Sequence, residues 1–346
     1  MCMKGRASCN SHSGTHSVLW YKGMPADNSI GDYWRGEPRK LEPMATEIEV
    51  LNAAFAISDL ARVVAGQGGL PKVRITSPTA SADIYLHGAQ VTAWRPADGE
   101  EVLFLSELSR WEDGRAIRGG IPVCFPWFRG NGDDQKAPAH GLVRTKGWRL
   151  ESLAAESDST IVTLATASDE GTRRWWPHDF RLMLRVTVGS QLKLELIVTN
   201  TGATPFRFEE ALHTYHCVGD ARKVKIAGLN GVSFLDNQDK NVEKVQNGDV
   251  TIVGPTDNAY LNTSSSLTIS DPAMRRRIQI EKQNSLTTVV WNPWESGAKA
   301  LADLGDDEWP RMACVEASNI LNSTVTLAPG EDHRMATTIS VMEESS

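Results

Sequence analysis

Two segments of the sequence place titratable side chains in runs that are otherwise apolar. One reads RFEEALHTYHCV (residues 207–218) and contains His213, and the other reads RMACVEASN (residues 311–319) and contains Glu316. Imidazole titrates near neutral pH, and a carboxylate that leaves water has its pKa raised. Glu316 is therefore a candidate general base, and His213 is a second candidate for proton transfer.

Both residues also have structural interpretations. His213 would be an ordinary core residue if it formed a hydrogen bond with Glu209 or Glu210, because buried polar groups are normally paired. Glu316 would be structural if a basic side chain formed a salt bridge with it. The residues alone leave these alternatives open.

Two further segments combine arginine with glycine and aromatic residues. AIRGGIPVCFPWF (residues 116–128) contains Arg118, and APAHGLVRTKGW (residues 137–148) contains His140 and Arg144. A guanidinium group forks onto phosphate, glycine lets backbone N–H groups approach an anion, and Trp or Phe can cover the apolar side of a sugar ring. A sugar-phosphate pocket is one interpretation, and a turn with a solvated arginine and a loop histidine is the other.

The hydrophobic pattern of the body indicates β-strands. From residue 45 onward, short runs with a period of two alternate with Gly, Pro, Asn and Asp, which is typical of an all-β antiparallel sandwich. FRLMLRVTV and LKLELIVTN meet at Gly189-Ser190 as in a tight hairpin. Short helices are expected only at SELSRWEDG (residues 106–114) and SGAKALADLG (residues 296–305). Asp257, in TDNAY, lies near another strand end.

Composition limits the function. The chain has 346 residues, a net charge of −7 and a pI near 5.7, so we expect no nucleic-acid partner. It contains no apolar run of about 18 residues, so we expect no membrane association.

Residues 1–44 lack periodicity and are expected to be a disordered tail, whereas residues 45–346 are expected to form one domain. The chain has no GxSxG, HExxH or nucleotide-binding glycine motif.

The five cysteines form no CxxC pair, which indicates reduced thiols and a cytoplasmic location. In the tail, Cys9, His12 and His16 could bind a metal, but no second cysteine pair completes a tetrahedral set. We therefore expect no metal site.

Taken in order, six motifs resemble the hexose-6-phosphate mutarotase branch of the aldose 1-epimerase family. They are RGGIPVCFPWF, HGLVR, EEALHTY, TDNAYL, WNPW with GDDEW, and CVEASN followed by TLAPGE. The similarity covers nearly all of the body. The sequence departs from the family pattern at TDNAY, which lacks a basic residue after the aspartate, and at His216, where an aromatic residue is usual.

The resemblance implies a galactose mutarotase-like β-supersandwich and a function. His213 would protonate the ring oxygen of the sugar, and Glu316 would take the proton from the anomeric hydroxyl, the two facing each other across the ring. Arg118 and Arg144 would bind the 6-phosphate, and His140 and Asp257 the sugar hydroxyls. The α and β anomers of D-glucose 6-phosphate, or of a related aldohexose 6-phosphate, would interconvert without cofactor or metal.

Two other functions remain open at this level. A non-catalytic carbohydrate-binding sandwich would use the same aromatic and polar groups without turnover. A glycoside hydrolase would need two carboxylates flanking the glycosidic bond, for which Asp257 and Glu316 are candidates. We expect a monomer whose partner is a small sugar phosphate.

Overall fold

The structure is a computed structural model that describes residues 46–132 and 134–343. Its helices are short: α1 (Glu47–Phe55), α2 (Glu170–Arg173) and α3 (Trp294–Lys299), with 3₁₀ turns at Gln67–Gly69, Asn237–Asp239, Trp309–Arg311 and Leu321–Ser323. None of these helices is long and apolar enough to cross a membrane. The predictions for the tail, including the Cys9, His12 and His16 set, lie outside the described residues.

Most of the described chain is β-structure. The strands are β1 (Ala61–Ala65), β2 (Pro71–Thr76), β3 (Ala80–Tyr85), β4 (Val91–Pro96), β5 (Val123–Cys124), β6 (Arg149–Glu156), β7 (Ser159–Ala167), β8 (Phe180–Val188), β9 (Leu192–Asn200), β10 (Phe206–Phe208), β11 (Glu210–Leu212), β12 (Tyr215–Cys217), β13 (Lys225–Ala227), β14 (Ser233–Asp236), β15 (Val242–Val245), β16 (Thr256–Tyr260), β17 (Leu267–Asp271), β18 (Arg276–Gln283), β19 (Thr287–Asn292), β20 (Met312–Asn319), β21 (Val325–Leu327) and β22 (Asp332–Glu343).

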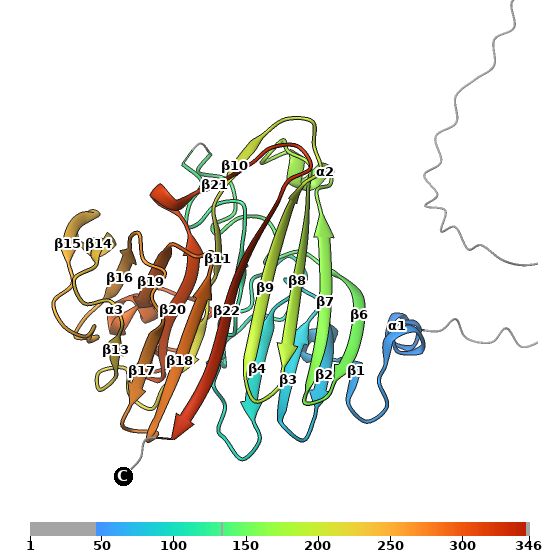
Figure 1. The fold of residues 1–346 in the computed structure, drawn as a ribbon, viewed down its shortest axis with the longest axis horizontal. Coiled ribbons are helices and arrows are strands. Elements are labelled where there is room, and N and C mark those ends of the chain that lie inside the picture. Colours follow the sequence, from blue (N-terminus) through green and yellow to red (C-terminus); the bar gives the residue numbers. More distant parts are fainter. Residues whose placement is uncertain (1–45, 133, 344–346) are drawn as a thin grey trace, which may run out of the picture. The chain divides into compact units, whose positions relative to one another are not determined.

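Two eight-stranded antiparallel sheets dominate the architecture. The β20 sheet has the order β15-β14-β16-β19-β20-β11-β5, with β12 also paired to β20, and the β22 sheet has the order β13-β17-β18-β22-β9-β8-β7-β6. A four-stranded sheet, β1-β2-β3-β4, and the pair β10-β21 complete the fold. In Figure 1 the long strands of the β22 sheet run beside one another, with β20, β19 and β16 to their left. The predicted all-β antiparallel architecture is confirmed.

One apolar core joins the sheets. Alternate residues of β8 and β9, such as Leu184 and Leu194, have no exposed surface and pack into it. Trp94 of β4, also fully buried, donates its indole N–H to the carbonyl oxygen of Gly189 at 3.3 Å, which attaches the four-stranded sheet to the β8–β9 turn. That turn closes the predicted hairpin, in which Val188 pairs with Leu192.

The helix predictions were only partly right. Helix α3 overlaps the second predicted segment, but residues 106–114 form turns. There the Ser106 hydroxyl and the Glu107 N–H donate to the carboxylate of Glu308, at 2.5 and 2.9 Å, so a tertiary contact replaces the helical hydrogen bonds. Helix α1 was not predicted, although its capping box of Thr46 and Glu49 is visible in the sequence.

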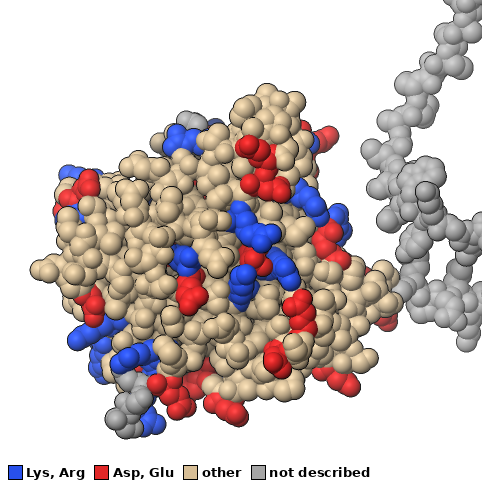
Figure 2. Space-filling model, viewed as in Figure 1, with Lys and Arg blue, Asp and Glu red and all other residues tan. Residues whose placement is uncertain are grey.

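The outer face of the β22 sheet carries charges of both signs. Figure 2 shows Lys and Arg side chains mixed with Asp and Glu across the middle of this face. The ion pairs of this sheet include Arg334 with Glu195 at 3.5 Å and Arg181 with Glu151 at 3.8 Å; both arginines are exposed, whereas Glu195 is buried. Such a face offers a polyanion no continuous basic surface.

A buried lysine joins the two large sheets from the inside. Lys282 of β18 donates to the hydroxyl of Thr288 on β19 at 2.6 Å and to the carbonyl oxygen of Thr263 at 2.9 Å. Burial lowers the pKa of Lys282 to about 7. The folded protein therefore releases this proton at a pH where an unfolded chain, with a lysine pKa of about 10.4, retains it.

This difference predicts a pH-dependent stability. Between pH 7 and about pH 10 the unfolded state binds more protons than the folded state, so the free energy of unfolding rises with pH. This gain in stability is lost as the pH falls toward 7. Relative to Lys282→Met, the free energy of unfolding of the wild type should rise by up to about 1.4 kcal/mol per pH unit. Urea unfolding of both proteins at pH 7 and pH 9 measures this, and a constant difference would contradict it.

Candidate active site

The register of β20 brings His213 and Glu316 together. Leu212, the last residue of β11, pairs with Ala317, and Tyr215, the first residue of β12, pairs with Cys314. His213 lies in the gap between β11 and β12, and the flanking register places it opposite Glu316. The sequence predicted an uninterrupted strand here, but the strand breaks after His213 because the Thr214 N–H turns back to the carbonyl oxygen of Leu212, at 2.9 Å.

Neighbouring strands extend this arrangement into the floor of a pocket. Val289 of β19 pairs with Glu316, and Asp257 of β16 pairs with Trp291. Since side chains alternate between the faces of a sheet, these residues point to the same side. A cavity of about 390 Å³, large enough for a small ligand, opens above them and is lined by Arg118, Phe128, Arg129, Ala139, His140, Arg144, His213, Tyr215, Asn237, Asp257, Val289, Trp291, Leu301 and Glu316. All six predicted site residues therefore line one pocket.

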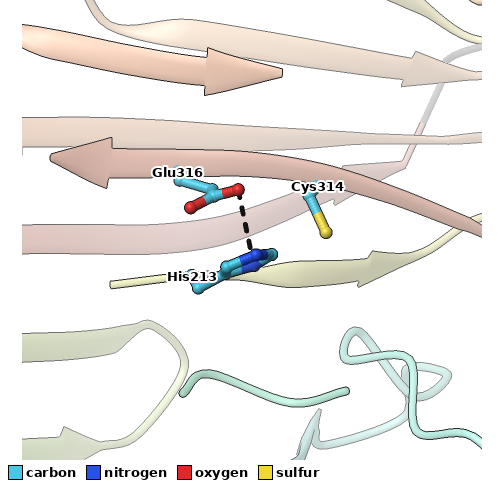
Figure 3. Close-up of side chains that lie close together, drawn as sticks. All are labelled: His213, Cys314 and Glu316. Atoms are coloured by element: carbon cyan, nitrogen blue, oxygen red, sulfur yellow. Dashed lines mark ion pairs between the residues drawn. The ribbon is translucent and has the colours of Figure 1, made fainter. Parts of the chain in front are cut away.

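The His213–Glu316 pair has unusual electrostatics. His213 Nδ1 and Glu316 Oε1 lie 3.4 Å apart (Figure 3). Within the described part of the chain, neither this nitrogen nor either carboxylate oxygen of Glu316 has a hydrogen-bond partner. Burial, reinforced by the charge of Asp257, raises the pKa of Glu316 well above its usual value. Burial also holds the pKa of His213 well below its usual value, so the pocket favours an uncharged pair.

The two glutamates that could have paired with His213 have other partners. Glu209 accepts hydrogen bonds from the N–H groups of Phe128 and Leu321, at 2.9 and 2.7 Å. Glu210 lies 2.9 Å from His333 Nε2 and accepts from the side-chain amide of Asn319 at 2.8 Å. Neither glutamate pairs with His213. Both instead hold the segments beside the pocket in place.

Arg118 is already well coordinated. Its Nη2 lies 3.0 and 3.1 Å from the two carboxylate oxygens of Asp303, and its Nη1 donates to the Tyr215 hydroxyl at 3.0 Å. Tyr215 and Asp303 raise the pKa of Arg118. Asp303 follows α3, and Leu301 from the same loop lines the pocket. Sequence reasoning expected a short helix over residues 296–305 and did not identify Asp303.

Arg144 differs from Arg118 in forming no ion pair with a carboxylate among the described residues. Its Nη2 donates to the carbonyl oxygen of Ala139 at 2.9 Å, and its buried Nε has no acceptor in the part of the chain that the structure describes. Burial lowers the pKa of Arg144. Burial, together with the charge of Arg144, also lowers the pKa of His140 to about 3. His140 is therefore a neutral hydrogen-bonding group at physiological pH.

Asp257 is held by two residues that the sequence did not suggest. Arg129 forms an ion pair with one of its carboxylate oxygens, and the Asn237 amide donates to the other at 2.6 Å. Arg129 comes from a segment more than a hundred residues away, so only the fold supplies Asp257 with a basic neighbour. The sequence signal that could have identified Arg129 was its position directly after the aromatic motif PWF. Both carboxylate oxygens of Asp257 are therefore engaged by protein groups, which disfavours the hydrolase interpretation.

The glycines after Arg118 serve packing. Gly120 donates its N–H to the carbonyl oxygen of Phe104 at 2.7 Å, so this group is not free to bind an anion, as the sequence had suggested. Gly120 has a φ of +61°, and a Cβ atom there would lie 2.2 Å from the carbonyl oxygen of Val91. Gly120 thus allows its own backbone to approach that of Val91 closely, and this packing positions the nearby Arg118.

We therefore expect Gly120→Ala to destabilise the protein by about 3 kcal/mol, since it combines a backbone clash with a strained φ. Gly130→Ala is the matched control, because a Cβ there would meet no atom within 4 Å. Urea unfolding of both variants measures the difference. Equal unfolding midpoints would show that the loop relaxes without cost.

The comparisons with known proteins agree with this geometry. The model of the aldose 1-epimerase family matches residues 71–340. A protein of Cenchrus ciliaris, provisionally named a glucose-6-phosphate 1-epimerase, is 34% identical over 299 residues, which are 83% of this chain and 90% of the relative. A protein of Escherichia coli K12 with the same provisional name is 37% identical over 250 residues, or 72% of this chain and 83% of the relative.

Solved structures confirm the predicted galactose mutarotase-like sandwich. A provisionally named mutarotase from Salmonella typhimurium superposes with a TM-score of 0.78 at 31% identity, covering 84% of this chain and 96% of that chain. A galactose 1-epimerase from Lactobacillus acidophilus, at 14% identity and a TM-score of 0.61 over 82% of this chain and 99% of its own, shares the fold. The chain belongs to the aldose 1-epimerase family and is an isomerase that interconverts the anomers of a sugar.

Proposed function

We propose that the substrate is D-glucose 6-phosphate or a related aldohexose 6-phosphate, and that His213 and Glu316 transfer the protons. The observation that carries the proposal is that these two side chains, whose facing atoms form no hydrogen bond in the described chain, lie in one pocket with three arginines. The arginines are Arg118, Arg129 and Arg144. The provisional names of the relatives support the same substrate.

The spacing of the pair suits the reaction. The ring oxygen and the anomeric hydroxyl are both bonded to C1, so the groups that serve them must lie side by side, and 3.4 Å meets this requirement better than the predicted placement across the ring. Glu316 takes the proton of the hydroxyl while His213 protonates the ring oxygen. The C1–O5 bond then breaks, C1 becomes an aldehyde, and rotation about C1–C2 followed by the reverse transfers closes the other anomer.

The phosphate has a role in this scheme beyond affinity. After burial and His140, the charges of Arg144 and Arg118 are the causes that hold down the pKa of His213. A phosphate dianion beside these arginines offsets their charge and raises the pKa of His213 again. The proton that Glu316 holds can then pass to the imidazole, and the imidazolium is the form that can protonate the ring oxygen.

An assay on freshly dissolved α-anomers tests the proposal. The enzyme should accelerate anomer exchange of glucose 6-phosphate far more than that of glucose, with a higher kcat as well as a lower KM. Polarimetry or NMR saturation transfer follows the exchange. Equal kcat/KM values for the two sugars would overturn the assignment of the phosphate.

A further inference from the structure

The proposed reaction leaves one buried polar group beside the His213–Glu316 pair without a role. Cys314 lies two residues before Glu316 on β20, so both side chains point to the same face of the sheet. The sulfur of Cys314, Nδ1 of His213 and a carboxylate oxygen of Glu316 all lie within 4.8 Å of one another. Figure 3 shows the thiol turned toward the imidazole, beside the carboxylate.

These three atoms are a donor set for zinc. Imidazole nitrogen, thiolate sulfur and carboxylate oxygen are the ligands that Zn²⁺ takes, at about 2.0–2.3 Å, which places donors on a tetrahedral ion about 3.3–3.6 Å apart. The nitrogen and oxygen are already 3.4 Å apart. The sulfur must approach by up to about 1.2 Å, which rotation of the cysteine side chain can supply.

The surroundings favour a complex of Zn²⁺ with this set. A neutral imidazole, a thiolate and a carboxylate together carry two negative charges, so a bound Zn²⁺ leaves no net charge at a buried position. The imidazole nitrogen and both carboxylate oxygens lack partners in the described residues, so binding breaks no hydrogen bond. The cavity, which His213 and Glu316 line, gives access to these two donors from solvent and leaves room for a fourth ligand.

The arginines of the pocket oppose a cation, but most of their charge is offset. Arg118 is paired with Asp303, and Arg129 with Asp257. Only Arg144, which faces no carboxylate among the described residues, opposes entry with an uncompensated charge. We therefore expect an affinity below that of a closed structural zinc site.

We propose that His213, Cys314 and Glu316 form a binding site for Zn²⁺ that inhibits the enzyme. The proposed binding of Zn²⁺ is argued only from the arrangement of the three donor atoms and does not depend on the proposed function. Inhibition rests on the proposed function, because the ion occupies both groups that transfer protons. A bound sugar phosphate, which covers the same groups, should exclude the ion.

The first experiment measures binding without using activity. Co²⁺ is titrated into the full-length protein, and the thiolate-to-cobalt charge-transfer absorption is recorded, with Zn²⁺ added afterwards to displace the cobalt. The wild type should show a band that Cys314→Ala and Glu316→Gln lose. Cys217→Ala and the tail variant Cys9→Ala are matched controls that should keep it. A band of equal intensity in Cys314→Ala, or none in the wild type, overturns the proposal.

The second experiment measures inhibition of anomer exchange by Zn²⁺, with Mg²⁺ as the control cation. Cys314→Ala should exchange anomers at the wild-type rate and need at least about tenfold more Zn²⁺ for half-inhibition. Equal inhibition of both proteins also overturns the proposal. A cobalt band that depends on Cys314, found in a protein without anomer exchange, supports the metal site while refuting the proposed function.

Discussion

Glu316→Gln should slow anomer exchange by about 10³-fold, since general acid–base catalysis contributes about 10²–10⁴-fold. The amide keeps the size of the carboxylate but cannot take a proton from the anomeric hydroxyl. NMR saturation transfer between the anomers of glucose 6-phosphate measures the loss. Glu295→Gln, which removes an exposed carboxylate paired with Lys299, is the matched control and should leave exchange unchanged. A Glu316→Gln enzyme with near wild-type exchange would remove this residue from the mechanism.

The same substitution should stabilise the protein at neutral pH. The folded pKa of Glu316 is raised, so above a pH of about 4 the folded state holds a proton that the unfolded chain has released. The contribution of Glu316 to stability is therefore full below that pH and is lost as the pH rises toward the folded pKa. Glu316→Gln lacks this loss, so its melting temperature should exceed that of the wild type at pH 8 but not at pH 4.

The proton pair can be tested with a double variant. His213→Asn should also lose about 10²–10³-fold in exchange rate, and the double variant His213→Asn/Glu316→Gln should be little slower than the worse single variant. Residues that act as one unit are not additive, because one proton is passed between them. Losses that multiply would show that the two side chains act independently.

Arg144→Ala should lower kcat/KM for hexose 6-phosphates by about 10–100-fold, the value of a hydrogen bond to a charged group, and leave free hexoses nearly unaffected. Arg144 is the guanidinium of the pocket that has no carboxylate partner in the described chain, so a phosphate meets it without displacing an anion. The loss should appear mainly in KM, because Arg144→Ala also removes a charge that lowers the pKa of His213.

Arg118→Ala provides an informative comparison. It should also weaken the preference for phosphate, but it leaves Asp303 without its partner and so should lower the melting temperature. Arg149→Ala, a change on the protein surface, is the control and should alter neither quantity. An Arg144→Ala enzyme that still prefers the phosphorylated sugar would place the phosphate elsewhere.

Much of the fold was predictable because strand alternation is a local property. β8 begins and ends where the periodicity of FRLMLRVTV predicted, and β20 covers the run MACVEASN. Predictions failed where a distant group decided the local conformation. The expected helix at residues 106–114 is replaced by turns that bind Glu308, and the expected continuous strand breaks at His213.

The sequence by itself determined the residue types of the site, since acid, base and arginine motifs can be recognised one at a time, and all six predicted residues line the pocket. Only the tertiary structure decided their partners. The pairing of Arg118 with Asp303, of Asp257 with Arg129, and of His213 with Glu316 joins residues roughly a hundred or more positions apart. The physical reason is that alternation along a strand selects the face of a side chain, whereas its neighbour on that face depends on the register between strands that pair only when the chain folds.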